Sequence, residues 1–187
     1  MLMIYISNAP LHGAALQHLQ TRQIIFLDAG STTSILAEEL RTLSGLMIIT
    51  NSLQAVFNLT VGYKHDAPQH EIILLGGRVQ QRPQTQGDLV ISEIYRYQAN
   101  IALLSPVGID PVHGASSFYS EEANIAKAMV KQAKQTFILA DQSKLGVVSR
   151  VRYAQHHEVS MLISNQEAKS EIDLASYQQH FQQIIWA

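Results

Sequence analysis

The stretch "IIFLDAGSTT", residues 24–33, decides the fold. Residues 24–27 are consecutively apolar, which is typical of a strand buried on both faces of a parallel sheet. The strand runs directly into Asp28 and Gly30, where glycine permits a tight turn, and then into three hydroxyl residues at 31–33 that favour the start of a helix. The stretch therefore predicts a strand, a turn and a helix, with polar groups collected where the strand ends.

The composition fits one domain of a cytoplasmic protein. The chain has 187 residues, of which 47% are hydrophobic, so it can bury one sizeable core. Its 13 basic residues nearly balance its 15 acidic residues, which excludes a strongly basic surface for nucleic acid or an acidic membrane. Cysteine is absent, which excludes disulfides and thiolate metal sites. The apolar runs are far shorter than the ~20 residues that a bilayer-spanning helix needs, so we expect no membrane segment.

Short apolar segments alternate with amphipathic segments along the chain. The apolar segments predict strands at residues 24–29, 46–50, 71–77, 101–105, 136–141 and 159–164. Helical periodicity predicts helices at 31–43, 52–63 and 120–135, the last with Ile125, Met129 and Ala133 facing inward. The tail at 175–187 predicts either a helix or a helix followed by a short strand. This alternation predicts an α/β fold in a single domain, with a mostly parallel, doubly wound sheet and helices on both faces.

Small, polar or cationic residues follow five of the predicted strands, at 28–33, 50–52, 76–82, 105–110 and 141–146. In an open α/β sheet, ligands bind at the carboxyl ends of the strands, and helix N-termini there favour phosphate or carboxylate groups. The hydroxyl residues would also serve as ordinary helix caps. Capping alone, however, does not account for two glycines in tandem or for Arg82 and Lys144 at the same edge. The pattern favours a site for a polyhydroxy anion such as a sugar phosphate.

The same residues carry a family resemblance. The ordered motifs "FLDAGSTT", "ITNSL", "ILLGGRVQQR", "GIDPVHGASS", "EEANIAKAMV" and "LADQSKLG" resemble the C-terminal effector-sensing domain of DeoR-family transcriptional repressors, from about residue 12 to about residue 165. The resemblance implies a Rossmann-like α/β domain related to ribose-5-phosphate isomerase and coenzyme A transferases. It also implies that the domain, at residues 12–187, binds a phosphorylated sugar or related metabolite. We expect no cofactor and no metal. Residues 1–11 form a lead that is either a linker remnant or not native.

Carried over by position, the resemblance assigns a phosphate-side loop and a set of further pocket positions. The loop comprises Asp28, Gly30, Ser31, Thr32 and Thr33, and the other positions are Asn51, Ser52, Gly76, Gly77, Arg82, Gly108, Glu122 and Lys144. A lysine at position 144 supplies a mobile point charge for a phosphate oxygen. The family implies a homo-oligomer that contacts DNA only through an N-terminal winged helix-turn-helix domain, to which nothing in this sequence corresponds.

The sequence departs from the family pattern at two places, and an enzyme is the alternative reading. Val107 stands where the family often has Asp, Asn or Ser, and Ala126 stands where it often has lysine, with Lys127 adjacent. A sugar-phosphate isomerase on the same fold would need a carboxylate base and a group that stabilises an oxyanion. Glu121, Glu122 and Lys144 have the right chemistry, but Val107 replaces the acid that those isomerases carry. We therefore expect that this chain is not an enzyme.

Two remaining groups of residues have simpler interpretations. His156 and His157 are adjacent in a polar segment, and His65 and His70 flank a proline-containing loop, so neither pair has the i, i+4 helical spacing of a metal site. Tyr95 and Tyr97 in "EIYRYQ" are candidates for a contact between subunits.

Overall fold

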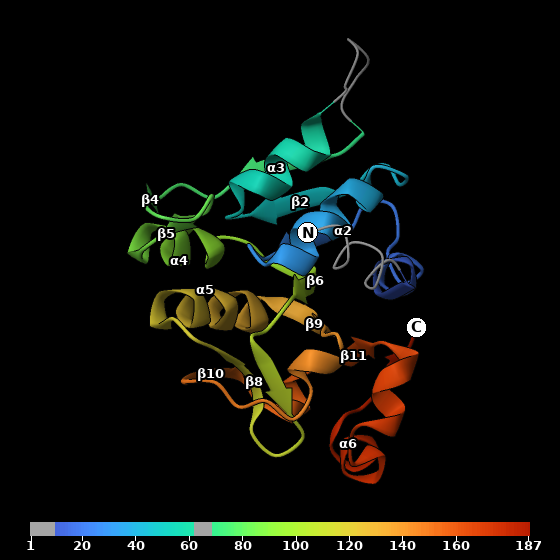
Figure 1. Cartoon of the computed structure of the whole chain (residues 1–187). Helices are drawn as coiled ribbons and strands as arrows, with labels where there is room; N and C mark the ends of the chain where they lie inside the picture. Colours follow the sequence, from blue (N-terminus) through green and yellow to red (C-terminus); the bar gives the residue numbers. More distant parts are fainter. Residues whose placement is uncertain (1–9, 62–68) are drawn as a thin grey trace.

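A seven-stranded parallel sheet forms the centre of the molecule (Figure 1). The computed structural model describes residues 10–61 and 69–187. The sheet has the strand order β12-β11-β9-β6-β1-β2-β3, and every neighbouring pair is parallel. Its strands are β1 (Ile24–Leu27), β2 (Met47–Thr50), β3 (Glu71–Leu74), β6 (Ala99–Leu104), β9 (Ala133–Leu139), β11 (Met161–Ser164) and β12 (Ile184–Trp186). The predicted α/β fold with a mostly parallel sheet is confirmed.

Helices cover both faces of this sheet. They are α2 (Ser31–Leu40), α3 (Leu53–Thr60), α4 (Asp88–Ile94), α5 (Ser120–Lys131) and α6 (Leu174–His180). Figure 1 shows α2 and α3 on one side of the sheet and α5 and α6 on the other. Residues 10–16 are also helical, and Leu11 in this segment is fully buried against the α2 side. Within residues 10–61 and 69–187, every helix falls short of the length and apolar character that a bilayer crossing requires.

Strand β1 shows why its sequence is apolar at every position. Successive side chains of a strand point to opposite faces of the sheet. Ile25 and Leu27 belong to the core on the α2 and α3 side, whereas Phe26 belongs to the core beneath α4, α5 and α6. All three side chains are fully buried. A strand buried on both faces cannot alternate with polar residues, so its first polar side chain, Asp28, comes where the strand leaves the core.

Two small antiparallel elements stand at the carboxyl ends of the parallel strands. The first is a three-stranded sheet of β7 (Gly108–Asp110), β8 (Gly114–Ser117) and β10 (Val151–Ala154), in the order β10-β8-β7. The second is a ribbon of β4 (Arg78–Val79) and β5 (Thr85–Gln86). The ribbon is tied to the end of β2, because the Thr85 N–H donates to the Asn51 carbonyl at 2.8 Å. Neither element follows from the sequence patterns above.

Several predicted boundaries need correction. Helix α5 ends at Lys131, and Ala133 begins β9, so Ala133 does not continue the inward face of the helix. Strand β3 ends at Leu74, which leaves Gly76 and Gly77 outside it. Helix α2 ends at Leu40, before the predicted residue 43, and the predicted end of the second helix at 62–63 lies outside the described residues. The tail follows the second of its two alternatives, because α6 is followed by β12.

Candidate functional site

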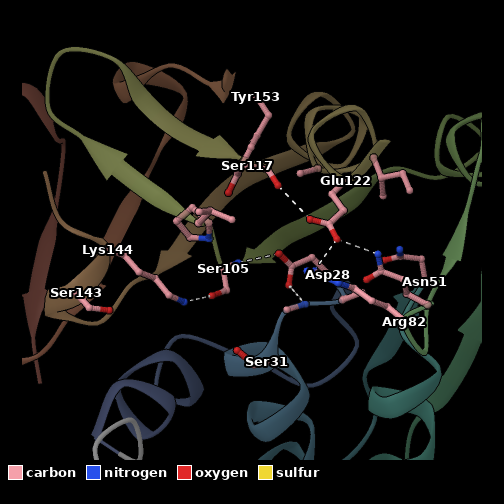
Figure 2. Close-up of a pocket in the computed structure, with 17 residues that line it drawn as sticks. Asp28, Ser31, Asn51, Arg82, Ser105, Ser117, Glu122, Ser143, Lys144 and Tyr153 are labelled. Atoms are coloured by element: carbon pink, nitrogen blue, oxygen red, sulfur yellow. Dashed lines mark hydrogen bonds and ion pairs between the residues drawn. The ribbon is translucent and has the colours of Figure 1, made fainter. Parts of the chain in front are cut away.

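The carboxyl ends of β1, β2 and β6 border a cavity of about 420 Å³ (Figure 2). Helix α5, the β4–β5 loop and the three-stranded sheet complete its walls. Polar side chains dominate the lining: Asp28, Ser31, Asn51, Arg82, Gln84, Ser105, Ser117, Glu122, Ser143, Lys144 and Tyr153. The remaining lining residues are Ala29, Gly30, Pro106, Val107, Ile125 and Ala126. The strand ends therefore meet at one site, as their parallel arrangement requires.

Asp28 organises the turn between β1 and α2. Its Oδ1 atom accepts hydrogen bonds from the Thr33 hydroxyl at 2.6 Å and from the Gly30 N–H at 3.1 Å, and its Oδ2 atom accepts from the Ser105 N–H at 2.8 Å. Burial raises the pKa of the Asp28 carboxyl above its ordinary value, while the hydrogen bonds from Thr33, Ser105 and Gly30 and the nearby Lys144 charge oppose that rise. The carboxylate thus holds the turn against the end of β6.

The N-terminus of α2 faces this cavity without a side-chain cap. Gly30 occupies the N-cap position and offers no side chain, and the first turn of α2 contains no acidic residue. Ser31, the first residue of the helix, is exposed and lines the cavity. A helix N-terminus carries about half a positive charge on its unsatisfied N–H groups. The cavity therefore has a positively polarised end.

Lys144 adds a full positive charge to the same end. It closes a short 3-10 helix, η1 (Gln142–Lys144), and its Nζ atom donates to the Ser105 hydroxyl at 2.7 Å and to the Thr32 hydroxyl at 3.2 Å. Its side chain is only 17% exposed, and burial lowers its pKa, although Asp141 and Asp28 oppose the shift. Lys144 is therefore a positioned cation rather than the mobile surface charge that the sequence suggested.

Glu122 and Arg82 form a second polar group across the cavity. The Glu122 Oε1 atom accepts from the Arg82 Nη1 atom at 2.9 Å and from the Gln84 Nε2 atom at 3.1 Å, and its Oε2 atom accepts from the Ser117 hydroxyl at 3.1 Å. These contacts join the β4–β5 loop to α5 and β8, as Figure 2 shows. The Glu122 carboxylate is thus already engaged by three donors in this structure.

Two buried polar atoms of the lining residues have no hydrogen-bond partner within the part of the chain that the structure describes: Asn51 Oδ1 and Tyr153 Oη. Asn51 is 3% exposed and Tyr153 is 5% exposed. The Asn51 Nδ2 atom donates to the Thr85 carbonyl at 3.0 Å, which fixes the amide. Buried polar groups in folded proteins are nearly always paired, so these two atoms are candidates for contacts with a bound molecule.

The structure separates the predicted site residues into three groups. Asp28, Gly30, Ser31, Asn51, Arg82, Glu122 and Lys144 line the cavity. Thr32 and Thr33 lie behind the wall, where their hydroxyls hold Lys144 and Asp28. Ser52 instead caps α3 by accepting from the Ala55 N–H at 3.0 Å, and three glycines serve packing or backbone contacts away from the cavity: Gly76, Gly77 and Gly108. Their ligand-binding roles remain a prediction.

The glycine at position 108 illustrates the difference between a packing and a binding role. A Cβ atom at Gly108 would lie 2.3 Å from the Val147 carbonyl oxygen, so only glycine permits this close approach. Val147 belongs to the segment between η1 and β10. Gly108 therefore allows the two segments beside the cavity to pack together.

The two departures from the family pattern both fall on the cavity wall. Val107 and Ala126 line it, whereas the side chain of Lys127 is exposed. Helix α5 therefore contributes no cation to the site. Sequence reasoning missed Gln84, Ser105, Ser117 and Tyr153. Ser105 lies at the end of β6, in a segment that was predicted to be polar, although Ser105 itself was not assigned to the site. Tyr153 gave no signal in the sequence, because its strand, β10, was not predicted.

Comparisons with known proteins assign this chain to a family. The family described as the DeoR C-terminal sensor domain matches residues 11–166. The HTH-type transcriptional repressor GlcR of Bacillus subtilis is 34% identical over 142 residues, which cover 75% of this chain and 52% of that protein. The chain spans little more than half the length of the curated relatives it matches.

Two solved structures share the fold. Ribose 5-phosphate isomerase A of Methanocaldococcus jannaschii has a TM-score of 0.52 at 16% identity, over 74% of this chain and 53% of that one. A transcriptional regulator of Streptococcus pneumoniae has a TM-score of 0.53 at 10% identity, over 91% of this chain and 84% of that one.

The chain belongs to the DeoR C-terminal sensor domain family. It is thus a sensor domain of the class found in sugar-related transcriptional regulators, and the isomerase alternative is not supported. Among residues 10–61 and 69–187 no group of three potential ligands is placed to hold a metal, and His65 lies outside those ranges.

The hydrogen bond from Thr33 to Asp28 predicts a pH-dependent loss of stability in Thr33→Val. Because the pKa of Asp28 is raised in the folded protein, Asp28 favours folding in acid, and that contribution is lost as the pH rises through the raised pKa. The Thr33 hydroxyl opposes the loss by stabilising the charged carboxylate. We expect Thr33→Val to lower the free energy of unfolding by about 1.5–3 kcal/mol at neutral pH and by less in mild acid.

Chemical denaturation at the two pH values measures this difference. Thr60→Val is the matched control, because the exposed Thr60 hydroxyl donates only to backbone carbonyls of its own helix. Its effect should be small and the same at both pH values. A Thr33→Val effect that does not change with pH would contradict the assignment.

Proposed function

We propose that this chain binds a phosphorylated sugar or related metabolite in the cavity, as the effector of a transcriptional regulator of sugar metabolism. The observation that carries the proposal is the uncapped N-terminus of α2 facing the positioned ammonium of Lys144. Backbone N–H groups, a lysine and the nearby hydroxyls of Ser31 and Ser105 are the donors that hold a phosphate in proteins. The anionic group of the effector would bind at this end.

The rest of the cavity fits a hydroxylated molecule. Its volume of about 420 Å³ lies in the range of small-molecule sites. Asn51 Oδ1 has no partner in the described part of the chain and needs a donor, which a ligand hydroxyl group can supply. An apolar ligand would leave this oxygen unpaired. We therefore infer that the effector carries hydroxyl groups on the carbons that extend from its anionic end.

We also propose that the chain self-associates and that the whole regulator contacts DNA through a separate winged helix-turn-helix domain. With a net charge of −2, this chain has no excess of positive charge to bind DNA. Leu89 on α4 and Tyr95 at its C-cap are 69% and 49% exposed, as expected of a contact surface, whereas Tyr97 packs partly buried against the core. Light scattering of the purified chain should give a mass above 20.8 kDa, and a strict monomer would contradict self-association.

Ser31→Glu should have opposite effects on folding and on binding. An acidic residue in the first turn of a helix is stabilising by roughly 0.3–1 kcal/mol, and α2 has none. The same carboxylate would occupy the positively polarised end of the cavity and repel the anionic group of the effector. We expect the melting temperature of the unliganded variant to hold or rise, while the thermal shift produced by phosphorylated sugars disappears.

Ser31→Gln separates charge from size in this experiment. Glutamine has the shape of glutamate without its charge, so it should retain more of the ligand-induced shift. The measurement is a thermal-shift screen of phosphorylated sugars, alditol phosphates and their unphosphorylated forms. Binding of only the unphosphorylated compounds, or an undiminished shift in Ser31→Glu, would contradict the proposal.

Lys144→Met tests the cation at the same end. Methionine keeps much of the length and apolar volume of lysine and removes its charge. We expect calorimetry to show effector binding weakened by about 1.5–3 kcal/mol, the range for a hydrogen bond to a charged group. Lys127→Met removes one positive charge from the exposed face of α5 and should leave affinity unchanged. Equal losses in the two variants would mean that Lys144 acts only through net charge.

A further inference from the structure

Two buried tyrosines beside the three-stranded sheet, Tyr177 and Tyr153, differ in the hydrogen bonding of their hydroxyl groups. The Tyr177 hydroxyl accepts from the Gly146 N–H at 2.6 Å and donates to the Ile109 carbonyl at 3.1 Å. The Tyr153 hydroxyl is equally buried and has no partner in the described part of the chain. Since tyrosine hydroxyls usually find a partner when buried, Tyr177 has a structural role that Tyr153 does not share.

Tyr153 reaches the cavity from the side opposite α2. It belongs to β10, which pairs with β8 in the three-stranded sheet, and its side chain lines the cavity. Figure 2 shows Tyr153 entering above Ser117 and pointing inward, with Asp28 and Lys144 on the opposite wall. Phenylalanine at this position would fill the same space. The hydroxyl group is therefore the part of Tyr153 that packing does not explain.

The surroundings define what the Tyr153 hydroxyl can bind. Burial and the negative charge of Asp28 raise the pKa of Tyr153 well above its ordinary value, so the hydroxyl keeps its proton and acts as a donor. The Asp28 Oδ2 atom accepts one hydrogen bond, from Ser105, and has capacity for another. A neutral ligand hydroxyl group is both an acceptor and a donor, so it can accept from Tyr153 and donate to Asp28.

We propose that Tyr153 is a specificity-determining residue of this cavity, whose hydroxyl donates a hydrogen bond to an uncharged hydroxyl oxygen of a phosphorylated polyol or sugar. The inference rests on the proposed function and adds the contact that distinguishes such an effector from a bare anion. Asn51 supports it from another wall, because its unpaired Oδ1 atom requires a donor that a fully ionised anion does not have. A hydroxylated ligand supplies an acceptor for Tyr153 and a donor for Asn51.

The experiment compares Tyr153→Phe with the wild-type chain by calorimetry, using inorganic phosphate, glucose 6-phosphate, fructose 1-phosphate, ribose 5-phosphate and sorbitol 6-phosphate as probes. We expect wild type to bind at least one of the organic phosphates more tightly than inorganic phosphate. Tyr153→Phe should weaken that binding about 10-fold, because a ligand hydroxyl is left without its donor. Inorganic phosphate should bind both proteins alike, and monodeoxy analogues of the preferred probe should identify one hydroxyl whose removal matters only in wild type.

Each outcome separates this inference from the proposed function. Lys144→Met should weaken inorganic phosphate and organic phosphates together, whereas Tyr153→Phe should affect only the organic ones. Unchanged binding of the preferred probe by Tyr153→Phe would overturn the role of Tyr153 and leave the anion site intact. If the wild-type chain binds inorganic phosphate as tightly as every organic phosphate, the role of Tyr153 is also overturned and the anion site again stays intact. Failure of every anionic probe would overturn the proposed function and this inference with it.

The melting temperatures of the unliganded variants test whether the Tyr153 hydroxyl has a structural role instead of a binding role. Tyr153→Phe removes no hydrogen bond that the structure describes, so its melting temperature should equal or exceed that of wild type. Tyr177→Phe removes two and should melt at a lower temperature. A Tyr153→Phe variant destabilised as much as Tyr177→Phe would show that the Tyr153 hydroxyl has an internal partner, which contradicts the proposal.

Discussion

The site depends on the Asp28 carboxylate and the three donors that hold it. These donors come from the turn after β1, from the first turn of α2 and from the end of β6, so one side chain fixes three segments relative to one another. The burial that raises the pKa of Asp28 is tolerated because the donors pair the carboxylate. With this turn in place, the N-terminus of α2 is directed into the cavity rather than capped by a side chain.

The charges around the cavity are arranged in two opposed groups. On one side, Lys144 is held by the hydroxyls of Ser105 and Thr32 beside the N-terminus of α2. On the other side, Arg82 is paired with Glu122, so its charge is largely balanced. Lys144 also lies 3.9 Å from the Asp141 carboxylate and near Asp28, but the N–H groups at the start of α2 beside it face no acidic residue in the first turn of the helix. We propose that an anionic, hydroxylated ligand binds with its anion at α2 and its hydroxyl groups toward Asn51 and Tyr153.

The sequence predicted the parts of the site that follow from the parallel sheet. A strand buried on both faces is continuously apolar, so Asp28 and Asn51 could be placed at the sheet edge from the point where each apolar run stops. Tyr153 could not be found in this way, because β10 is short and lies in a small antiparallel sheet whose pairing depends on residues distant in the chain. The sequence could not show which glycines at strand ends line the cavity. Gly30 lines it, whereas Gly108 is required by a close contact with the backbone of Val147.

A structure of the chain crystallised with a phosphorylated sugar that raises its melting temperature tests the central claim most directly. We predict that the phosphate lies at the N-terminus of α2, within hydrogen-bond distance of the Lys144 ammonium, and that sugar hydroxyls reach Asn51 Oδ1 and Tyr153 Oη. A phosphate bound instead between Arg82 and Glu122, or a ligand bound outside the cavity, would contradict it.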